Sequence, residues 1–339
     1  MEDDGDMRMK EKLVKLISKW HDKRVLVVGD LTADIYLDGH IARISREAPV
    51  LVLEPTEEKT LLGAAANVIH NGAVLGARIF AGGIIGEDSA GEQLVSEMCK
   101  FGVNTEFIVK TPLEHTISKQ RIMAWDHAVV RQHIVRIDRV PKNGFPKNEA
   151  FELAKMITKI IPNMDVVILS DYGNGTLNNS SACTIIDECN KYRIPSFVDS
   201  RYAITNYSNI SYIKQNESEL AAFAGVEEFA EKEDLIVAGE KLRVQLNAKA
   251  ALISLGTEGV MVIQEKVVDH IPVRDKSEIY DVNGAGDTLT MVAALAISAG
   301  ANIVDAAKIA NYAAGVVVRK MGTATLTVEE LRTVIEQFE

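Results

Sequence analysis

The chain has 339 residues, of which 47% are hydrophobic and 25% are charged, and its formal net charge is −11. This length holds one large domain or two modest ones, and the composition is that of an ordinary globular protein. The negative charge argues against nucleic acid as a partner, because binding to a phosphate backbone needs a cationic face.

No apolar run approaches the length of a membrane span, and no segment resembles a signal peptide. The three cysteines, Cys99, Cys183 and Cys189, lack paired spacing. We therefore expect reduced thiols, no membrane partner and a cytoplasmic location.

The elements predicted in chain order begin with a short amphipathic helix, because Leu13, Leu16, Ile17 and Trp20 keep helical spacing. Short apolar runs typical of buried parallel strands follow at 24–30, 78–82, 165–171, 194–199, 210–214 and 250–256. Helical stretches lie between them at 64–75, 90–101, 150–161, 180–192, 217–224 and 232–246. This alternation predicts an α/β fold, a doubly wound sheet between two helical layers, in a single domain over 1–339.

Two segments interrupt the alternation, 35–54 and 107–139, which are rich in β-branched and alternating residues without a helix between their strands. Residues 118–125 and 133–138 alternate polar with apolar side chains, as half-exposed strands do. We expect the two insertions to form a small antiparallel sheet. It projects from the main sheet as a lid, as a dimer contact, or as both.

The run Asp281-Val282-Asn283-Gly284-Ala285-Gly286-Asp287-Thr288 precedes an apolar helix-forming stretch at 289–297. A turn of small residues that opens a helix points several N–H groups in one direction, with the positive end of the helix dipole behind them. Gly284, Ala285 and Gly286 are thus a predicted anion hole for phosphate. Asp287 is predicted to take a proton from a hydroxyl that attacks the phosphoryl group. The alternative is that Asp287 only caps the helix and the glycines only permit close packing.

Ligands of doubly wound sheets bind beyond the carboxyl ends of the strands, where Asp30, Asp171, Asp199 and Gly256 lie. Gly63-Ala64-Ala65-Ala66-Asn67-Val68 opens a helix, and the glycine-rich stretch 82–91 follows. With the run around Asp287, these motifs resemble the ribokinase-like (PfkB) carbohydrate kinase family from about Val25 to Thr327. Residues 29–36, 42–50 and 316–323 are similar to its heptose-7-phosphate kinase branch, which serves ADP-heptose biosynthesis.

The resemblance implies a ribokinase-like fold with a β-lid, ATP and Mg²⁺ as cofactors, and a homodimer formed through the lid. It implies phosphotransfer to the anomeric hydroxyl of D-glycero-D-manno-heptose 7-phosphate. Because the chain ends at Glu339 without a His-x-Gly-His motif, it resembles the stand-alone kinase more than the kinase part of a bifunctional protein. The alternatives are a kinase for ribose, fructose or 2-keto-3-deoxygluconate, and a family member that only senses a sugar or nucleotide.

The resemblance also implies roles for individual residues. The sugar site would comprise Asp34, Asn67, Gly63, Ala64 and Asp30, although Asp30 has the alternative of satisfying backbone donors where its strand ends. The sugar phosphate would be bound by Arg46, Lys119, Arg121 and Arg136, each of which has the alternative of being a solvated strand residue.

The nucleotide site would comprise Asn216, Glu219, Ser254, Gly256, Gly259, Asn311 and Gly315, with Glu219 reaching Mg²⁺ through water. Asn216 and Glu219 have the alternative of a capping box. Some relatives imply K⁺ near Asp281, Val282 and Gly322. The chain departs from the family pattern at Ala64, Ser200, Arg201 and Met291.

Overall fold

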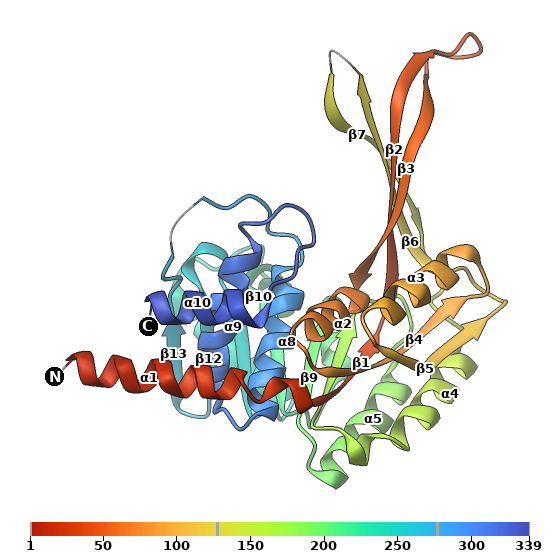
Figure 1. Ribbon diagram of the computed structural model, residues 1–339. Helices are drawn as coiled ribbons and strands as arrows, with labels where there is room; N and C mark the ends of the chain where they lie inside the picture. Colours follow the sequence, from red (N-terminus) through yellow and green to blue (C-terminus); the bar gives the residue numbers. More distant parts are fainter. Residues whose placement is uncertain (1, 127–128, 276–277, 339) are drawn as a thin grey trace.

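Figure 1 shows the computed structural model of the protein, which describes residues 2–126, 129–275 and 278–338. Within these residues the main sheet has nine strands in the order β13-β12-β11-β10-β9-β8-β1-β4-β5. Strands β11 to β5 in that order are parallel, and β12 and β13 are antiparallel additions. The strands are β1 (Arg24–Gly29), β4 (Arg78–Gly86), β5 (Asn104–Thr111), β8 (Val166–Asp171), β9 (Ser196–Ser200), β10 (Tyr212–Asn216), β11 (Ala250–Ser254), β12 (Val260–Gln264) and β13 (Val267–Ile271).

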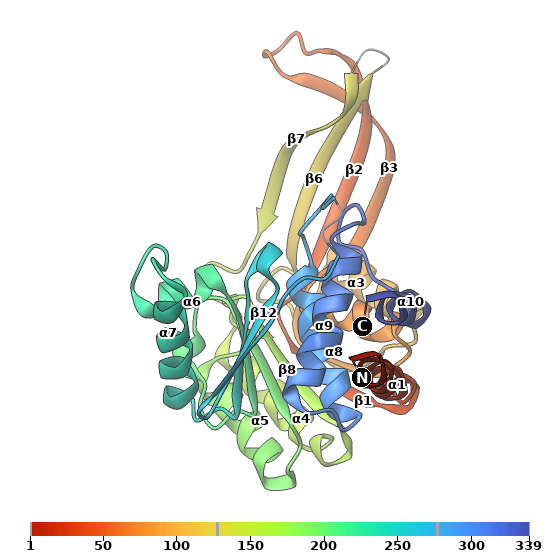
Figure 2. The same cartoon turned by 90° about the vertical axis from the view of Figure 1, so that its left-hand side faces the viewer.

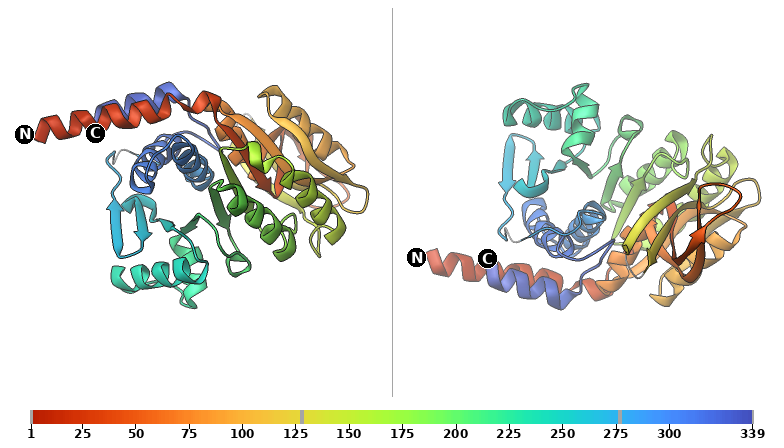
Figure 3. Two further views of the ribbon diagram at one scale, coloured as in Figure 1. Left: turned by 90° about the horizontal axis from the view of Figure 1, so that it is seen from below. Right: turned by 90° about the horizontal axis from the view of Figure 1, so that it is seen from above.

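Helices lie on both sides of the main sheet (Figure 3). One side carries α1 (Glu2–Ile17), α2 (Ala65–Val74), α3 (Ser89–Lys100), α8 (Ala285–Ser298), α9 (Ile303–Val317) and α10 (Val328–Phe338). The other carries α4 (Lys147–Thr158), α5 (Asn179–Tyr192), α6 (Glu217–Ala224) and α7 (Lys232–Gln245). Short 3-10 turns lie at Trp20–Asp22, Ile161–Asn163, Ile204–Asn206 and Gly256–Glu258. Strand alternation divides the core, since Val25 and Val27 pack under the first layer while Leu26 and Val28 pack under the second.

A separate sheet, the lid, rises from the carboxyl end of β1 (Figures 1 and 2). In the described chain it has four strands in the order β3-β2-β6-β7. They are β2 (Leu31–Ile44), β3 (Leu51–Ala64), β6 (Ile117–Asp126) and β7 (Val129–Arg139). The pairs β2–β3 and β6–β7 are antiparallel, but β2 and β6 run parallel.

The predicted three-layer α/β/α arrangement with a lid is confirmed. The prediction of an antiparallel lid is wrong for its centre, because β1 and β5 end at the same edge of the parallel sheet and the chain leaves both of them outward. The predicted lid segments, 35–54 and 107–139, also differ from the observed ones. The first pair of lid strands begins at Leu31 and ends at Ala64, and the second begins at Ile117, since β5 belongs to the main sheet. Strands β12 and β13 and helix α10 were not predicted. None of the helices among the described residues is long and apolar enough to cross a membrane.

Candidate active site

Asp287 lies in the first turn of α8, where two side chains hold its carboxylate. Asn67 Nδ2 of α2 donates to Asp287 Oδ2 at 2.7 Å, and the Tyr172 hydroxyl, from the loop after β8, donates to Oδ1 at 2.8 Å. Beneath them, the Thr288 hydroxyl donates to Asn71 Oδ1 at 2.8 Å and ties α8 to α2. Among the described residues no backbone N–H of α8 donates to the Asp287 carboxylate, unlike the geometry of a helix cap.

The surroundings of Asp287 give its carboxyl group a pKa that suits a general base. Burial raises the pKa of Asp287 to about 6, although the hydrogen bonds from Asn67 and Tyr172 act in the opposite direction. Burial and the Asp287 charge also raise the pKa of Tyr172 well above its ordinary value, so its hydroxyl stays a donor. A carboxylate with this pKa is ionised at neutral pH and still basic enough to accept a proton.

Backbone N–H groups and a buried cation meet at the start of α8. The Ala285 N–H donates to Val282 O at 3.3 Å across the turn, so this amide is used within the chain. The Gly284 and Gly286 N–H groups have no backbone partner within the described part of the chain. A Cβ on Gly286 would lie 3.0 Å from Lys214 Nζ, which places the ammonium group beside the predicted anion hole.

Lys214 is a buried residue of β10, and sequence reasoning did not assign it. Its Nζ lies 3.1 Å from Asp199 Oδ2, and the Thr290 hydroxyl donates to the same oxygen at 3.0 Å. Burial alone would lower the pKa of Lys214, but the carboxylates of Asp199 and Glu219 outweigh it and the pKa is raised. Lys214 therefore stays charged. A lysine at the end of a predicted buried strand was the available signal, because buried charges need a partner.

Asp30 and Asp171, two predicted strand-end carboxylates, hold the loop that carries Tyr172. Asp30 is fully buried and accepts the backbone N–H groups of Tyr172, Asn174 and Thr176 at 2.9 to 3.2 Å. Asp171 accepts hydrogen bonds from the Gly173 N–H and from two hydroxyls. For Asp30 the structure favours the alternative given above, because its oxygens are used by the backbone.

The predicted sugar residues Asp34, Gly63 and Ala64 lie together where the lid joins the body. Asp34 of β2 stands opposite Leu61 of β3, and a Cβ on Gly63 would collide with the Asp34 carboxylate. Gly63 therefore makes room for Asp34. Ala64 has φ 52° and ψ −128°, a backbone conformation that favours glycine.

Three of the four predicted phosphate-binding cations share one face of the lid. Lys119 stands opposite Asp34 in register, and Arg121 stands opposite Arg136. Arg121 Nη1 lies 2.6 Å from Asp34 Oδ1, and Arg136 pairs with Asp138 at 2.9 and 3.0 Å. The structure separates Arg46 from this group. It lies at the exposed β2–β3 turn, twelve residues beyond Asp34, which is roughly 35 Å or more of extended strand.

The predicted nucleotide residues Asn216 and Glu219 form the capping box that was their alternative role. Asn216 N donates to Glu219 Oε2 at 2.8 Å, and Glu219 N donates to Asn216 Oδ1 at 2.7 Å. The second carboxylate oxygen of Glu219 faces Arg201 Nε at 3.7 Å. Burial raises the pKa of Glu219. The cap and a further polar contact through Oε1 are compatible.

The other predicted nucleotide residues differ in their surroundings. A Cβ on Gly259, where φ is +100°, would collide with the Ile271 carbonyl, so this glycine permits close strand packing. The Asn311 amide donates to Ile271 O and Pro272 O, and the Ser254 hydroxyl to Gln215 O. No atom lies within 4 Å of an added Cβ at Gly256 or Gly315 in the described chain, so both border open space.

The two loops that contain the predicted K⁺ site, around Asp281 and Gly322, meet at the Asp281 carboxylate. Gly322 N donates to Asp281 Oδ2 at 3.1 Å, and Asn283 N donates to Oδ1 at 2.9 Å. Val282 is exposed. Among the described residues no cluster of three histidine, cysteine, aspartate or glutamate side chains forms a metal site.

The departures from the family pattern have local explanations. Met291 is fully buried, and a Cβ on Gly72 of α2 would lie 2.7 Å from its Cε, so Gly72 leaves room for the larger side chain. The Ser200 hydroxyl donates to Asp171 Oδ2 at 2.8 Å. The Arg201 guanidinium lies 5.5 Å from the ring centre of Tyr172.

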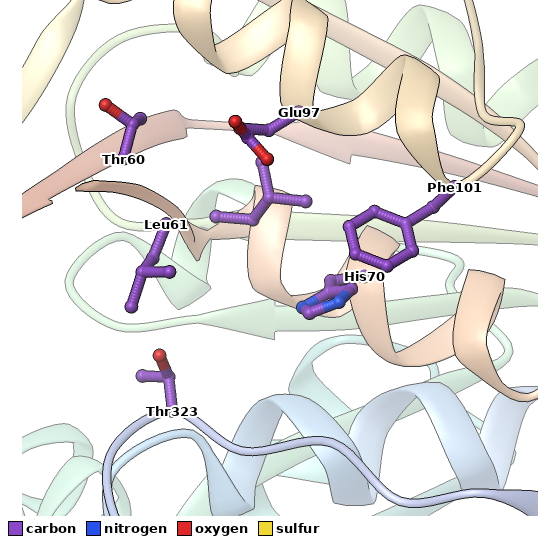
Figure 4. Close-up of a pocket in the computed structure, with 7 residues that line it drawn as sticks. Thr60, Leu61, His70, Glu97, Phe101 and Thr323 are labelled. Carbon is purple, nitrogen blue, oxygen red and sulfur yellow. The ribbon is translucent and has the colours of Figure 1, made fainter.

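A small cavity of about 90 Å³ borders the lid base but none of the proposed catalytic side chains (Figure 4). Its lining residues are Thr60, Leu61, Leu62, His70, Glu97, Phe101 and Thr323. The His70 and Phe101 ring centres are 4.3 Å apart, and burial lowers the pKa of His70. Thr323, which lines the cavity, also lies near Gly284.

Similar proteins identify the family of the chain. The sequence profile of the pfkB family carbohydrate kinases matches residues 22–330. The chain is 36% identical over 316 residues to the bifunctional protein HldE of a Nitratiruptor species. It is 36% identical over 325 residues to the HldE of Mesorhizobium japonicum. These alignments cover 93% and 95% of the chain, which spans 65% and 64% of the two relatives.

Solved structures show the same fold. Arabidopsis thaliana ribokinase, complexed with ribose and ATP, matches with a TM-score of 0.70 at 19% identity over 93% of this chain and 99% of that one. Escherichia coli phosphofructokinase-2, in complex with substrates and products, matches with a TM-score of 0.74 at 18% identity and the same coverage. The chain is therefore a sugar phosphotransferase of the pfkB family of carbohydrate kinases, a membership that implies ATP and a divalent metal ion.

Proposed function

We propose that the chain transfers the γ-phosphoryl group of ATP to the anomeric hydroxyl of D-glycero-D-manno-heptose 7-phosphate, in the cytoplasm. Asp287 carries the proposal, as a buried carboxylate with a pKa of about 6 beside free backbone donors and the Lys214 ammonium. The phosphorylated heptose is supported by the resemblance of residues 29–36, 42–50 and 316–323, by the HldE relatives, and by the cations on the lid face.

In the proposed reaction Asp287 removes the proton of the acceptor hydroxyl as its oxygen bonds to phosphorus and the bond to the leaving phosphate oxygen breaks. Asn67 and Tyr172 keep the carboxylate oriented. The Gly284 and Gly286 N–H groups and Lys214 stabilise the charge on the phosphoryl oxygens, because donors fixed in a buried site need no reorganisation. Asp34 is proposed to accept hydrogen bonds from the sugar hydroxyls.

The residues beside Lys214 fit a magnesium nucleotide. Mg²⁺ in kinases is held by one or two carboxylates, by phosphate oxygens and by waters, and a dedicated protein cage is unnecessary. Glu219 offers Oε1, and Asp199 lies beside it. The metal ion would supply charge neutralisation on the phosphates. Ser254, Gly256, Gly259, Asn311 and Gly315 are proposed to border the nucleotide, and K⁺ is proposed near Asp281, Val282 and Gly322.

We also propose a homodimer formed through the lid. On the face opposite Arg121, apolar side chains stand in register across three strands in the row Leu37-Ile122-Val135, and in the next row Ile35 and Ile137 stand on either side of Gln120. Val135 and Ile137 are 48% and 41% exposed. A second copy of this face is the proposed cover, and the inhibited form of Escherichia coli phosphofructokinase-2 is a tetramer. Sedimentation of a Val135→Asp, Ile137→Asp variant should then give monomers, and an unchanged mass would refute the lid interface.

The decisive experiment measures ATP consumption with Mg²⁺ and K⁺ over phosphorylated and free sugars. Turnover of heptose 7-phosphate alone, lost in Asp287→Ala and kept in Asp269→Ala on β13, would support the proposal. Turnover of ribose, fructose or 2-keto-3-deoxygluconate would replace the substrate but keep the base. ATP binding without turnover of any sugar would favour the sensing alternative. Replacing K⁺ by Na⁺ in the same assay tests the monovalent site.

A further inference from the structure

Two groups that the proposed function assigns to different parts of the substrate bind each other at the lid base. Arg121 Nη1 lies 2.6 Å from Asp34 Oδ1, and the side chains are only 22% and 10% exposed. The Arg121 guanidinium also lies over the Tyr36 ring, 5.1 Å from its centre. We call this contact the lid-base ion pair.

The Asp34 carboxylate has fewer rotatable bonds than the Arg121 guanidinium that it binds. Gly63 provides the space that its Oδ2 occupies, and any side chain at Gly63 would collide with that oxygen. Asp34 has a short side chain that keeps its carboxylate close to β2, whereas Arg121 has a long side chain that can rotate. Arg121 is the member of the pair that can change partner.

Two other cations lie beside the lid-base ion pair. Lys119 is next to Asp34 in register on the same face and forms no ion pair with a carboxylate among the described residues. Arg136 stands opposite Arg121 but is held by Asp138 through two hydrogen bonds. A phosphate group on the substrate would thus meet three cations, of which only Arg121 is bound to a sugar-binding carboxylate.

We propose that the lid-base ion pair selects substrates by charge, because Arg121 releases Asp34 to the sugar hydroxyls only when an anionic group of the substrate replaces Asp34 as its partner. A neutral sugar gives Arg121 no new partner and would leave a half-buried guanidinium unpaired. Arg121 then has two roles, since it binds the phosphate of the correct substrate and keeps Asp34 from neutral sugars. Specificity of this kind comes from disfavouring the wrong substrate as well as from binding the right one. This inference rests on the proposed function, since it takes Asp34 as a sugar ligand.

The test compares Arg121→Gln with the matched variant Arg136→Gln, which removes the same charge one strand away without freeing Asp34. Substrates are D-glycero-D-manno-heptose 7-phosphate and the unphosphorylated heptose. Arg121→Gln should lower kcat/KM for the phosphorylated sugar by about 100-fold and raise it for the neutral sugar by about tenfold. Arg136→Gln should lower the first without raising the second. An unchanged or reduced neutral-sugar value in Arg121→Gln overturns the inference.

Inorganic phosphite supplies a second measurement. Added to the wild-type protein with neutral heptose, it should raise turnover because it draws Arg121 from Asp34, and it should have no such effect in Arg121→Gln. If another sugar proves to be the substrate, the same comparison applies to its phosphorylated and free forms. If no sugar is turned over, the proposed function fails, and calorimetric binding of the two sugars to wild type and Arg121→Gln still decides the inference. Equal neutral-sugar affinity in both proteins would refute it.

Discussion

Replacing Asp287 by asparagine should stop turnover and make the folded protein more stable at pH 8. The pKa of Asp287 rises from an ordinary 3.8 to about 6 in the folded chain. The folded state therefore binds the proton more tightly than the unfolded state does. Above pH 6 the ionised carboxylate lowers the free energy of unfolding by about 3 kcal/mol. This cost falls to about half at pH 5 and disappears below 3.8, where both states are protonated.

Asparagine keeps the shape of Asp287 without its charge. It still accepts the Tyr172 hydrogen bond, but its amide opposes the Asn67 amide, which costs about 1 kcal/mol. The net gain at pH 8 is then about 2 kcal/mol. For a chain of this length that gain raises Tm by roughly 3 °C.

The assay is thermal unfolding at pH 8 and pH 5, with ATP turnover measured in parallel. The stability gain of Asp287→Asn should shrink to near zero at pH 5. Asp269→Asn, a substitution of equal size on β13, should leave both Tm and turnover close to wild type. A loss of stability at pH 8, or a gain that does not depend on pH, would refute the burial argument for the base.

Three further substitutions probe the same region. Ala64→Gly should raise the free energy of unfolding by about 1 kcal/mol in denaturant melts, since φ 52° with ψ −128° strains alanine, and a loss would contradict that strain. Tyr172→Phe removes a hydrogen bond that lowers the pKa of Asp287, so the acidic limb of kcat/KM should move to higher pH. Activity should fall up to about tenfold at pH 6 and little at pH 8.5, and an unmoved limb would exclude the link. Gly286→Ala pushes a methyl group against Lys214 and should lower kcat about 100-fold with little change in Tm, whereas near-normal kcat would remove Lys214 from the reaction.

Local sequence patterns predict most of the fold and the centre of the candidate site. Alternating apolar runs and helical stretches predict parallel strands whose ends meet at one edge, and Asp30, Asp171 and Asp199 lie at such strand ends in the structure. The glycine turn before Asp287 is likewise a local signal, because the geometry of a helix start depends on neighbouring residues only.

Contacts between distant segments could not be predicted in this way. Tyr172 reaches Asp287 only because Asp30 folds the loop after β8 back over β1, and no local motif encodes that contact. The sequence predicts that Arg46 belongs to the lid, but it does not predict how long β2 and β3 are, and this length separates Arg46 from the other lid cations. The parallel pairing of β2 with β6 depends on where two main-sheet strands end, which is a property of the assembled sheet.

Strand β2 also has a mechanical consequence, because this one strand runs from Asp34, the proposed sugar ligand, toward the far tip of the lid. Strand β2 then acts as a lever that pivots near the lid-base ion pair and extends about 40 Å to the tip of the lid. A tilt of about 5° at the base moves the tip by about 3–4 Å at that length. We expect a molecule bound at the tip to be sensitive to the proposed release of Asp34 by Arg121, and in turn to resist or favour that release.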